Sequence, residues 1–131
     1  MPSIVRAMGQ GDLEQVHHLF KAAPESEGKF ESFLNLVYDR DGEILGYLGV
    51  QIVDGYVYAG PLLLRAGASP FIAMRIGAAL EASMAAFGIS SFFFVIPEEM
   101  DEWQQMVKRA GNYEDLGASG KFHWYGRTKK R

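Results

Sequence analysis

The middle of the chain carries a strand, loop, helix and strand in succession, and this pattern limits the fold more than any other feature of the sequence. A β-rich run at Tyr56–Leu64 is followed by the loop Arg65–Pro70, an apolar helical stretch at Phe71–Phe87 and the strand-like run Ser91–Ile96. This order predicts a βαβ crossover, in which two parallel strands are covered by the connecting helix. The loop then presents backbone N–H groups at a helix N-terminus, where a phosphate group can bind. The sequence therefore indicates a place for a phosphate-bearing ligand.

Length and composition fit a single globular domain over residues 1–131. A net charge of -3 gives no general attraction to nucleic acid or to acidic membranes, so neither is expected as a partner. The chain has no cysteine, which excludes disulfides and thiolate metal sites and permits a reducing compartment. Its longest apolar stretch, Phe71–Phe87, is interrupted by Arg75 and Glu81, and its N-terminus does not resemble a signal peptide. We expect a cytoplasmic protein that does not span a membrane.

The N-terminal part of the chain is predicted to form a short strand and a helix. Ser3–Ala7 favours a strand, and apolar residues at helical spacing follow Asp12, which is a plausible N-cap. The helix should end before Pro24. The polar run Glu25–Lys29 is expected to be a loop that could border a binding cleft.

A three-stranded antiparallel meander is expected next, because two Asp-Gly turns separate three β-rich runs. The strands are expected at Phe30–Tyr38, Ile44–Val53 and Tyr56–Leu64, with turns at 39–42 and 54–55. Gly60-Pro61 falls inside the last strand, where proline cannot donate a ladder hydrogen bond and glycine allows close backbone approach. We therefore predict a kink or bulge at this dipeptide.

The C-terminal half is predicted to contain two helices around a central strand and to end in a hairpin. The helix at Phe71–Phe87 is apolar around most of its circumference, so we expect it to be buried, and Ser91–Ile96 should be buried on both faces. A second helix follows, with acidic residues at its start, basic residues at its end and Gly111 as its stop. A hairpin over 113–127 should precede a basic, frayed tail at 127–131.

The whole order of elements resembles the GNAT N-acetyltransferase superfamily over nearly the full chain. Ser3–Ala7 with the following Gly11-Asp12-Leu13 looks like the family's opening, and the run Asp41–Tyr47 looks like its second turn and third strand. The resemblance implies an α/β fold with a mixed, mostly antiparallel sheet, one parallel βαβ crossover and helices on both faces. It also implies acetyl-CoA as the cofactor, with its pyrophosphate on the loop after the fourth strand.

The cofactor loop departs from the family pattern, in which glycines let the diphosphate approach bare backbone. Counting back from Gly88 puts Ala68 at the usual Gln/Arg position and Phe71 and Ala73 at the two glycine positions, so Ala73 alone fits. A slipped alignment uses Arg65, Ala66 and Gly67 instead, with Arg65 or Arg75 supplying positive charge. The residues that the resemblance implies for cofactor binding are Leu63, Leu64, Arg65, Ala66, Gly67, Ala68, Ser69, Phe71, Ala73 and Arg75.

The family's common catalytic residues are also replaced. Counting back from Gly111, Met100 stands at the usual Asn position and Val107 at the usual Tyr position, so the common general acid is absent. Amine acetylation needs a base for the ammonium and an acid for the departing thiolate. The candidate substitutes are Tyr58, Glu98 and Glu99. The alternative for each is structural: Tyr58 packs on the sheet, and the two glutamates favour a helix start.

Two further groups of residues are not expected to form a functional site, and His17 and His18 are expected at the surface or at its boundary. His17 and His18 point about 100° apart on a helix, and His123 is distant in sequence, so no metal site is expected. Phe92, Phe93, Phe94, Trp124 and Tyr125 form an aromatic group without interleaved basic residues, which favours core packing over nucleic-acid stacking.

Two functions from different classes remain open. The first is an acyl-CoA-dependent N-acetyltransferase that acts on a small-molecule or peptide amine. The second is a GNAT-fold module that has lost cofactor binding and serves in binding or assembly, with a protein partner or a second copy of itself. Degenerate relatives of this kind occur among bacteriophage virion and head-assembly proteins, so a virion-associated location is the alternative to the cytoplasm. Fold analogy alone cannot choose between the two functions.

Overall fold

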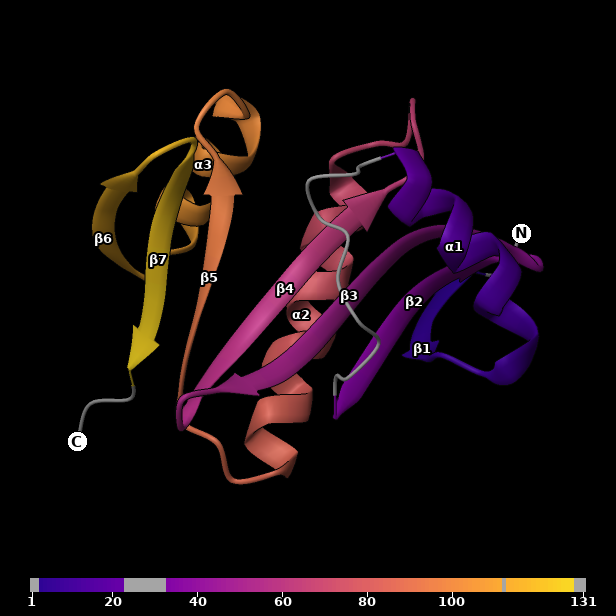
Figure 1. Cartoon of the computed structure of the whole chain (residues 1–131), viewed down its shortest axis with the longest axis horizontal. Coiled ribbons are helices and arrows are strands. Elements are labelled where there is room, and N and C mark those ends of the chain that lie inside the picture. Colours follow the sequence, from indigo (N-terminus) through magenta and orange to yellow (C-terminus); the bar gives the residue numbers. More distant parts are fainter. Residues whose placement is uncertain (1–2, 23–32, 112, 129–131) are drawn as a thin grey trace.

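The computed structural model describes residues 3–22, 33–111 and 113–128, which form a seven-stranded mixed sheet with helices on both faces (Figure 1). In chain order the elements are β1 (Ser3–Ala7), a 3-10 turn (Gln10–Asp12), α1 (Leu13–Ala22), β2 (Leu34–Arg40), β3 (Glu43–Val53), β4 (Tyr56–Leu64), α2 (Phe71–Ala86), β5 (Ser91–Pro97), α3 (Asp101–Ala110), β6 (Glu114–Ser119) and β7 (Phe122–Thr128). The predicted loop at 25–29 and the start of the strand predicted from Phe30 lie outside the described residues.

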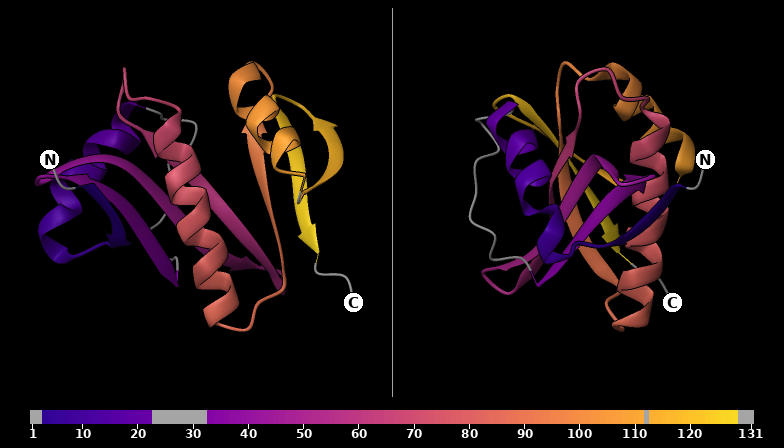
Figure 2. Two further views of the ribbon diagram at one scale, coloured as in Figure 1. Left: turned by 180° about the vertical axis from the view of Figure 1, so that it is seen from behind. Right: turned by 90° about the vertical axis from the view of Figure 1, so that its right-hand side faces the viewer.

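The sheet order is β1-β2-β3-β4-β5-β7-β6, and every neighbouring pair is antiparallel except β4 and β5. α2 connects these two parallel strands, which confirms the predicted βαβ crossover. α2 and α3 lie on one face of the sheet and α1 lies on the other (Figures 1 and 2). The expected fold class is therefore confirmed.

The two Asp-Gly turns of the meander are as predicted. Asp41 and Gly42 have φ values of 56° and 92°, and Asp54 and Gly55 have values of 52° and 83°. Positive φ at both central residues matches the right-handed twist of the strands that such a turn joins, and Asp-Gly adopts it at low cost. These turns set the order β2-β3-β4 and bring β4 to the middle of the sheet.

Side chains alternate along the central strands and divide the apolar core into two layers. Leu36 and Leu48 pack beneath α2, whereas their neighbours Val37 and Tyr47 pack beneath α1. The layer beneath α2 also receives the buried helical residues Ile72, Ile76, Leu80 and Met84, which recur every four positions.

The prediction that α2 is buried around most of its circumference is wrong. Phe71 and Met74 are 55% and 53% exposed, because the sheet covers only the side of the helix that carries Ile72 and Ile76. The prediction for β5 needs a similar correction. Phe92 and Ile96 are buried, but the residues between them are only partly buried, since β4 does not run alongside β5 for its full length.

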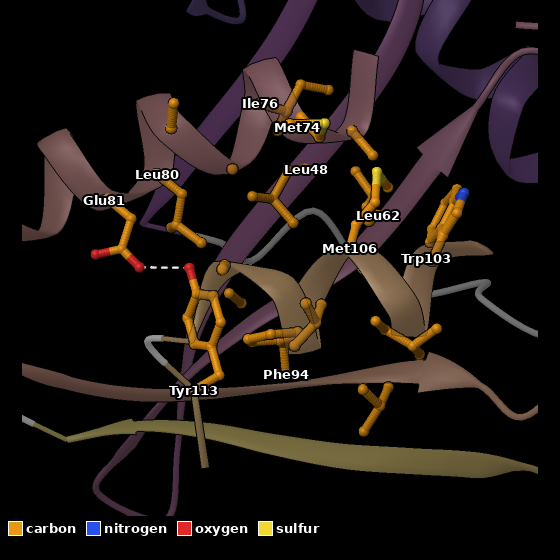
Figure 3. A pocket seen from close by; sticks show the side chains of 18 residues that line it. Leu48, Leu62, Met74, Ile76, Leu80, Glu81, Phe94, Trp103, Met106 and Tyr113 are labelled. Carbon is orange, nitrogen blue, oxygen red and sulfur yellow. Dashed lines mark hydrogen bonds between the residues drawn. The ribbon is translucent and has the colours of Figure 1, made fainter. Parts of the chain in front are cut away.

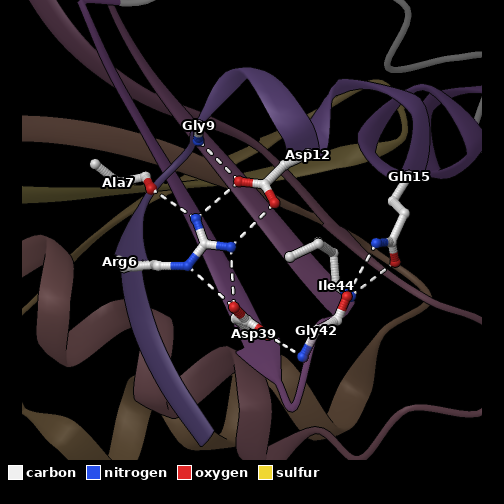
Figure 4. Close-up of polar contacts among 8 residues, drawn as sticks. All are labelled: Arg6, Ala7, Gly9, Asp12, Gln15, Asp39, Gly42 and Ile44. Carbon is white, nitrogen blue, oxygen red and sulfur yellow. Dashed lines mark hydrogen bonds and ion pairs between the residues drawn. The ribbon is translucent and has the colours of Figure 1, made fainter.

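A charged network fixes the start of α1 against the sheet (Figure 4). The Arg6 guanidinium donates to both carboxylate oxygens of Asp12, at 2.7 and 3.0 Å, and to Asp39 at 2.9 Å. Asp12 lies inside the 3-10 turn and accepts the Gly9 N–H at 2.8 Å, so it is not the N-cap of α1 as predicted. Its hydrogen bonds with Arg6 lower the pKa of the Asp12 carboxyl.

The segment predicted as a basic tail from residue 127 is partly structured. Arg127 belongs to β7, and its guanidinium lies 3.3 Å from the Glu81 carboxylate of α2. Residues 129–131 lie outside the described part of the chain. The tail prediction is therefore wrong for Arg127, because β7 pairs with β5 past this residue, as far as Thr128.

Candidate functional site

The parallel strands β4 and β5 are in register at one pair of residues, Tyr58 and Phe93, and diverge toward their C-terminal ends (Figure 1). The predicted irregularity in β4 is present. Leu48 of β3 lies opposite Leu62 and Val50 lies opposite Ala59, so Gly60 and Pro61 together face one residue of β3. This bulge bends β4 and increases its local twist. Beyond the Tyr58–Phe93 pair, the edges of β4 and β5 that face each other do not pair, although β4 still pairs with β3 and β5 with β7.

A pocket of about 290 Å³ lies between α2, α3 and these diverging strands (Figure 3). The walls are largely apolar. α2 contributes Ala73, Met74, Ile76, Gly77, Ala78, Leu80 and Glu81; α3 contributes Trp103, Met106, Val107 and Ala110; and Leu48, Ala59, Leu62, Phe94, Val95, Ile96 and Tyr113 complete the lining. Pockets with apolar walls and few polar groups are typical of small-molecule and cofactor sites.

The polar side chains of the pocket gather at one end. Figure 3 shows Glu81 and Tyr113 together at one end and Trp103 at the opposite end. The Tyr113 hydroxyl donates a hydrogen bond to one oxygen of Glu81, and Arg127 lies 3.3 Å from the other. Burial and the Glu81 carboxylate raise the pKa of the Tyr113 hydroxyl far above its usual range, so it stays protonated. The polar groups at this end of the pocket are therefore bound to one another: Tyr113 and Arg127 both contact the Glu81 carboxylate.

The loop predicted to hold a phosphate begins at the end of β4 and leads into α2. Of its backbone amides, that of Arg65 donates to Leu45, that of Ala68 to Arg65, and that of Phe71 to the Ser69 hydroxyl at 3.1 Å. Within the described residues, no acceptor is found for the amides of Ala66, Gly67 and Ser69. The Phe71 ring is exposed and is not part of the pocket wall, so it does not fill the opening between the strands.

The structure separates the other residues of the predicted cofactor site. Among the ten, Ala73 lines the pocket. Leu63 packs beneath α1, whereas Leu64 and Ala68 pack beneath α2. The Arg65 guanidinium lies 3.3 Å from the Glu43 carboxylate, and that of Arg75 lies 5.7 Å from the ring centre of Tyr38. Neither arginine lines the pocket.

The three catalytic candidates do not meet at one point. Tyr58 lies on the opposite face of β4 from its neighbour Ala59, which lines the pocket, and burial raises the pKa of its hydroxyl. Glu98 lies beyond β5 and is bound to His123. Glu99 is exposed. The two glutamates precede α3, which begins at Asp101.

His123 of β7 joins the start of α3 to β6. Its Nδ1 lies 3.1 Å from Glu98 and its Nε2 lies 2.6 Å from Asp115. These hydrogen bonds, that with Asp115 first, raise the pKa of the imidazole above its ordinary value of 6.5. The carboxylates occupy opposite sides of the ring, and no group of three or more His, Asp or Glu side chains placed to hold a metal ion is found in the described part of the chain.

The predicted aromatic group is divided by the sheet. Phe94 stacks on Tyr125, with ring centres 5.7 Å apart, on the face that carries α2 and α3. Phe93 stacks on Trp124, at 5.5 Å, on the opposite face, where it also contacts Tyr58 at 5.2 Å. Tyr125 is buried and Phe94 packs against the core, which fits the predicted packing role, whereas Phe93 and Trp124 are both only partly buried.

Sequence reasoning missed most residues of the pocket. Trp103, Met106, Val107 and Ala110 form an apolar stripe with helical spacing on an otherwise charged helix, and this signal was available. Glu81 and Tyr113 carried no such signal, because 32 residues separate them in the sequence. No helix among the described residues is both long and apolar enough to cross a bilayer.

No family model and no curated protein matches the sequence. Solved structures do match. An N-acetyltransferase from Staphylococcus aureus Mu50 superposes with a TM-score of 0.75 at 11% identity, covering 99% of this chain and 100% of that one. The PaiA N-acetyltransferase from Thermoplasma acidophilum, solved in complex with coenzyme A, superposes with a TM-score of 0.71 at 12% identity, covering 98% of this chain and 100% of that one. An acetyltransferase of the GNAT family from Bacillus cereus superposes with a TM-score of 0.67 at 15% identity, covering 100% of both chains. This chain therefore has the GNAT N-acetyltransferase fold over nearly its full length.

Proposed function

We propose that the chain binds an acyl-coenzyme A, such as acetyl-CoA, in the pocket between α2 and α3 and transfers the acyl group to an amine. The observation that carries this proposal is the opening between β4 and β5, which pair at Tyr58 and Phe93 and then diverge beside an apolar pocket. Unpaired strand edges bind extended ligands through backbone hydrogen bonds. The amide-containing arm of coenzyme A is such a ligand, and the fold neighbour solved with coenzyme A supports this choice.

The loop before α2 is the proposed site of the diphosphate. The amides of Ala66, Gly67 and Ser69 are available in the loop that leads into the N-terminus of a 16-residue helix, and the helix dipole there favours an anion. Arg65 forms a surface ion pair with Glu43 in which the two side chains are 42% and 53% exposed. Such pairs contribute little to stability, so Arg65 can leave Glu43 and contact a phosphate at small cost.

The proposed reaction is acyl transfer from sulfur to nitrogen. The amine nitrogen attacks the thioester carbonyl carbon, a C–N bond forms, the C–S bond breaks, the amine loses one proton and the thiolate gains one. Tyr58 is the proposed acid, because it lies where β4 and β5 begin to diverge and a tyrosine hydroxyl carries its proton at neutral pH. The proton of the amine passes to solvent water, because Glu98 and Glu99 follow the C-terminal end of β5 and lie away from the Tyr58–Phe93 pair near its start.

The cofactor proposal is tested by thermal unfolding in the presence of coenzyme A and acetyl-CoA. A ligand that binds the folded state stabilises it by about 2.7 kcal/mol at a hundredfold excess over Kd, so the Tm should rise. Gly77→Phe should abolish this rise, because Gly77 lines the pocket and an added Cβ meets nothing within 4 Å. Ala85→Phe, at an exposed position of the same helix, is the matched control. An unchanged Tm with millimolar ligand, or an equal rise in Gly77→Phe, would refute the proposal.

A second candidate is a ligand-binding module without catalysis. Val107 favours it, because this side chain lines the pocket and cannot donate a proton to a thiolate. The two candidates differ in turnover. If acetyl-CoA raises the Tm but no amine accepts the acetyl group, the module is supported; if Tyr58→Phe reduces a measurable transfer rate while acetyl-CoA still binds, the enzyme is supported.

A further inference from the structure

Four aromatic side chains form a continuous surface on the sheet face opposite α2 and α3. This aromatic platform consists of Tyr56 and Tyr58 of β4, Phe93 of β5 and Trp124 of β7. Phe93 is its centre, with ring-centre distances of 6.4 Å to Tyr56, 5.2 Å to Tyr58 and 5.5 Å to Trp124. Tyr56 is 68% exposed and the other three are partly buried, so the platform presents ring surface to solvent.

The platform and the pocket meet where β4 and β5 diverge. Tyr58 belongs to the platform and the next residue, Ala59, lines the pocket. Val95 also lines the pocket and lies directly opposite Trp124 across the β5–β7 pair. A molecule on the platform therefore lies beside the opening between β4 and β5, where acyl-coenzyme A is proposed to bind, and this opening connects the two faces of the sheet.

The chemistry of the platform favours a particular kind of ligand. No charged side chain occurs in the three short segments that carry the four rings, which are residues 56–60, 92–95 and 124–126. Aromatic faces attract cations and stack against flat apolar groups, whereas an anion gains no attraction from the faces of the rings. The net charge of -3 of the whole chain also favours a cationic ligand over an anionic one.

We propose that the aromatic platform binds the acyl acceptor and selects a protonated amine attached to a flat apolar body, such as an arylalkylamine. This inference rests on the proposed function for its role in the reaction. The ammonium group lies against the rings until it loses a proton, and the apolar body supplies the stacking area. Acceptors with a carboxylate in place of the amine are excluded by the same surface.

The probe is 2-phenylethylamine, compared by titration calorimetry with 3-phenylpropionate, which has the same ring and a carboxylate. The wild-type protein should bind the amine and not the acid. Tyr56→Ser should weaken amine binding about threefold and Trp124→Leu about tenfold, as expected for loss of one cation–π or stacking contact. Phe87→Ala is the control, because Phe87 is also an exposed aromatic residue, at 58%, and contacts Phe33 instead of the platform.

Tyr56→Ser keeps the test decisive if Trp124→Leu disturbs folding, since Tyr56 is the most exposed ring of the four. Equal binding of the acid, amine binding that is unchanged in both variants, or no amine binding by the wild-type protein would overturn the inference. The Tm shift with coenzyme A separates the two proposals. If coenzyme A raises the Tm but the amine does not bind selectively, the amine-binding role of the platform is overturned and the proposed cofactor site stands. If the amine binds selectively but coenzyme A does not raise the Tm, the platform is an amine-binding site but its role as the acyl-acceptor site is overturned.

Discussion

Gly60 and Tyr58 should be strongly coupled in stability, and this coupling tests the geometry of the opening between β4 and β5. A Cβ atom at Gly60 would lie 2.7 Å from the Tyr58 hydroxyl oxygen and 2.8 and 2.9 Å from two ring carbons. The Tyr58 ring cannot move away freely, because Phe93 and Trp124 pack against it at 5.2 and 6.4 Å between ring centres. Overpacking of this kind costs about 1–3 kcal/mol, which is the expected loss of unfolding free energy in Gly60→Ala.

In a Tyr58→Val background the clash is absent. There, Gly60→Ala should be neutral or stabilising by up to about 1 kcal/mol, because alanine restricts the unfolded chain more than glycine does. Urea unfolding of the wild type, both single variants and the double variant gives the coupling free energy, which should be about 1–3 kcal/mol or more. Gly11→Ala is the control, since its Cβ meets nothing within 4 Å. If the two substitutions are additive within about 0.5 kcal/mol, the placement of Tyr58 over the bulge is refuted.

Three further outcomes are expected. Asp12→Asn should cost about 1–2 kcal/mol at pH 7 in urea unfolding, because Arg6 loses an ionic partner. Since Arg6 lowers the pKa of Asp12, this difference should begin to shrink as the pH falls below the ordinary carboxyl value of 3.8 and should vanish once the pH is below the lower folded-state pKa; a difference that does not shrink with falling pH would contradict the pairing. The raised pKa of His123 means that its ion pairs stabilise the fold below pH 6.5 and are lost as the pH rises through the folded-state value, so the Tm gap between wild type and His123→Gln should shrink toward alkaline pH. Ile76→Ala should lower the unfolding free energy by about 2–4 kcal/mol in chemical denaturation, because Ile76 is on the buried side of α2 and is 1% exposed; a loss below 1 kcal/mol would show that the packing is looser than described.

Local sequence signals predicted much of the fold. The Asp-Gly turns, the Gly60-Pro61 bulge and the βαβ crossover depend on residues close together in the chain, and all three were confirmed. The burial of α2 was overestimated because composition does not reveal how much of a helix a neighbouring sheet covers, as the exposed Phe71 and Met74 show.

The candidate site was predicted less well than the fold. Its location beside the crossover follows from the order of elements, but its wall depends on contacts between distant segments. Tyr113 reaches Glu81 only because α3 and the β5–β7–β6 arrangement return the chain to α2. Adjacent Phe93 and Phe94 face opposite sides of the sheet, so one neighbour joins the platform and the other lines the pocket. Neither fact is encoded in a short motif.

The single register pair between Tyr58 and Phe93 also has a mechanical consequence. It is the seam of the sheet, where the half containing β1–β4 meets the half containing β5–β7 through few backbone hydrogen bonds. A small rotation of one half against the other breaks few hydrogen bonds, so the sheet should open locally at this seam at a lower free-energy cost than at the hairpins β2–β3 and β3–β4. A ligand bound between β4 and β5 would contact both halves of the sheet and reduce this opening. Its binding should therefore slow amide hydrogen exchange in both halves.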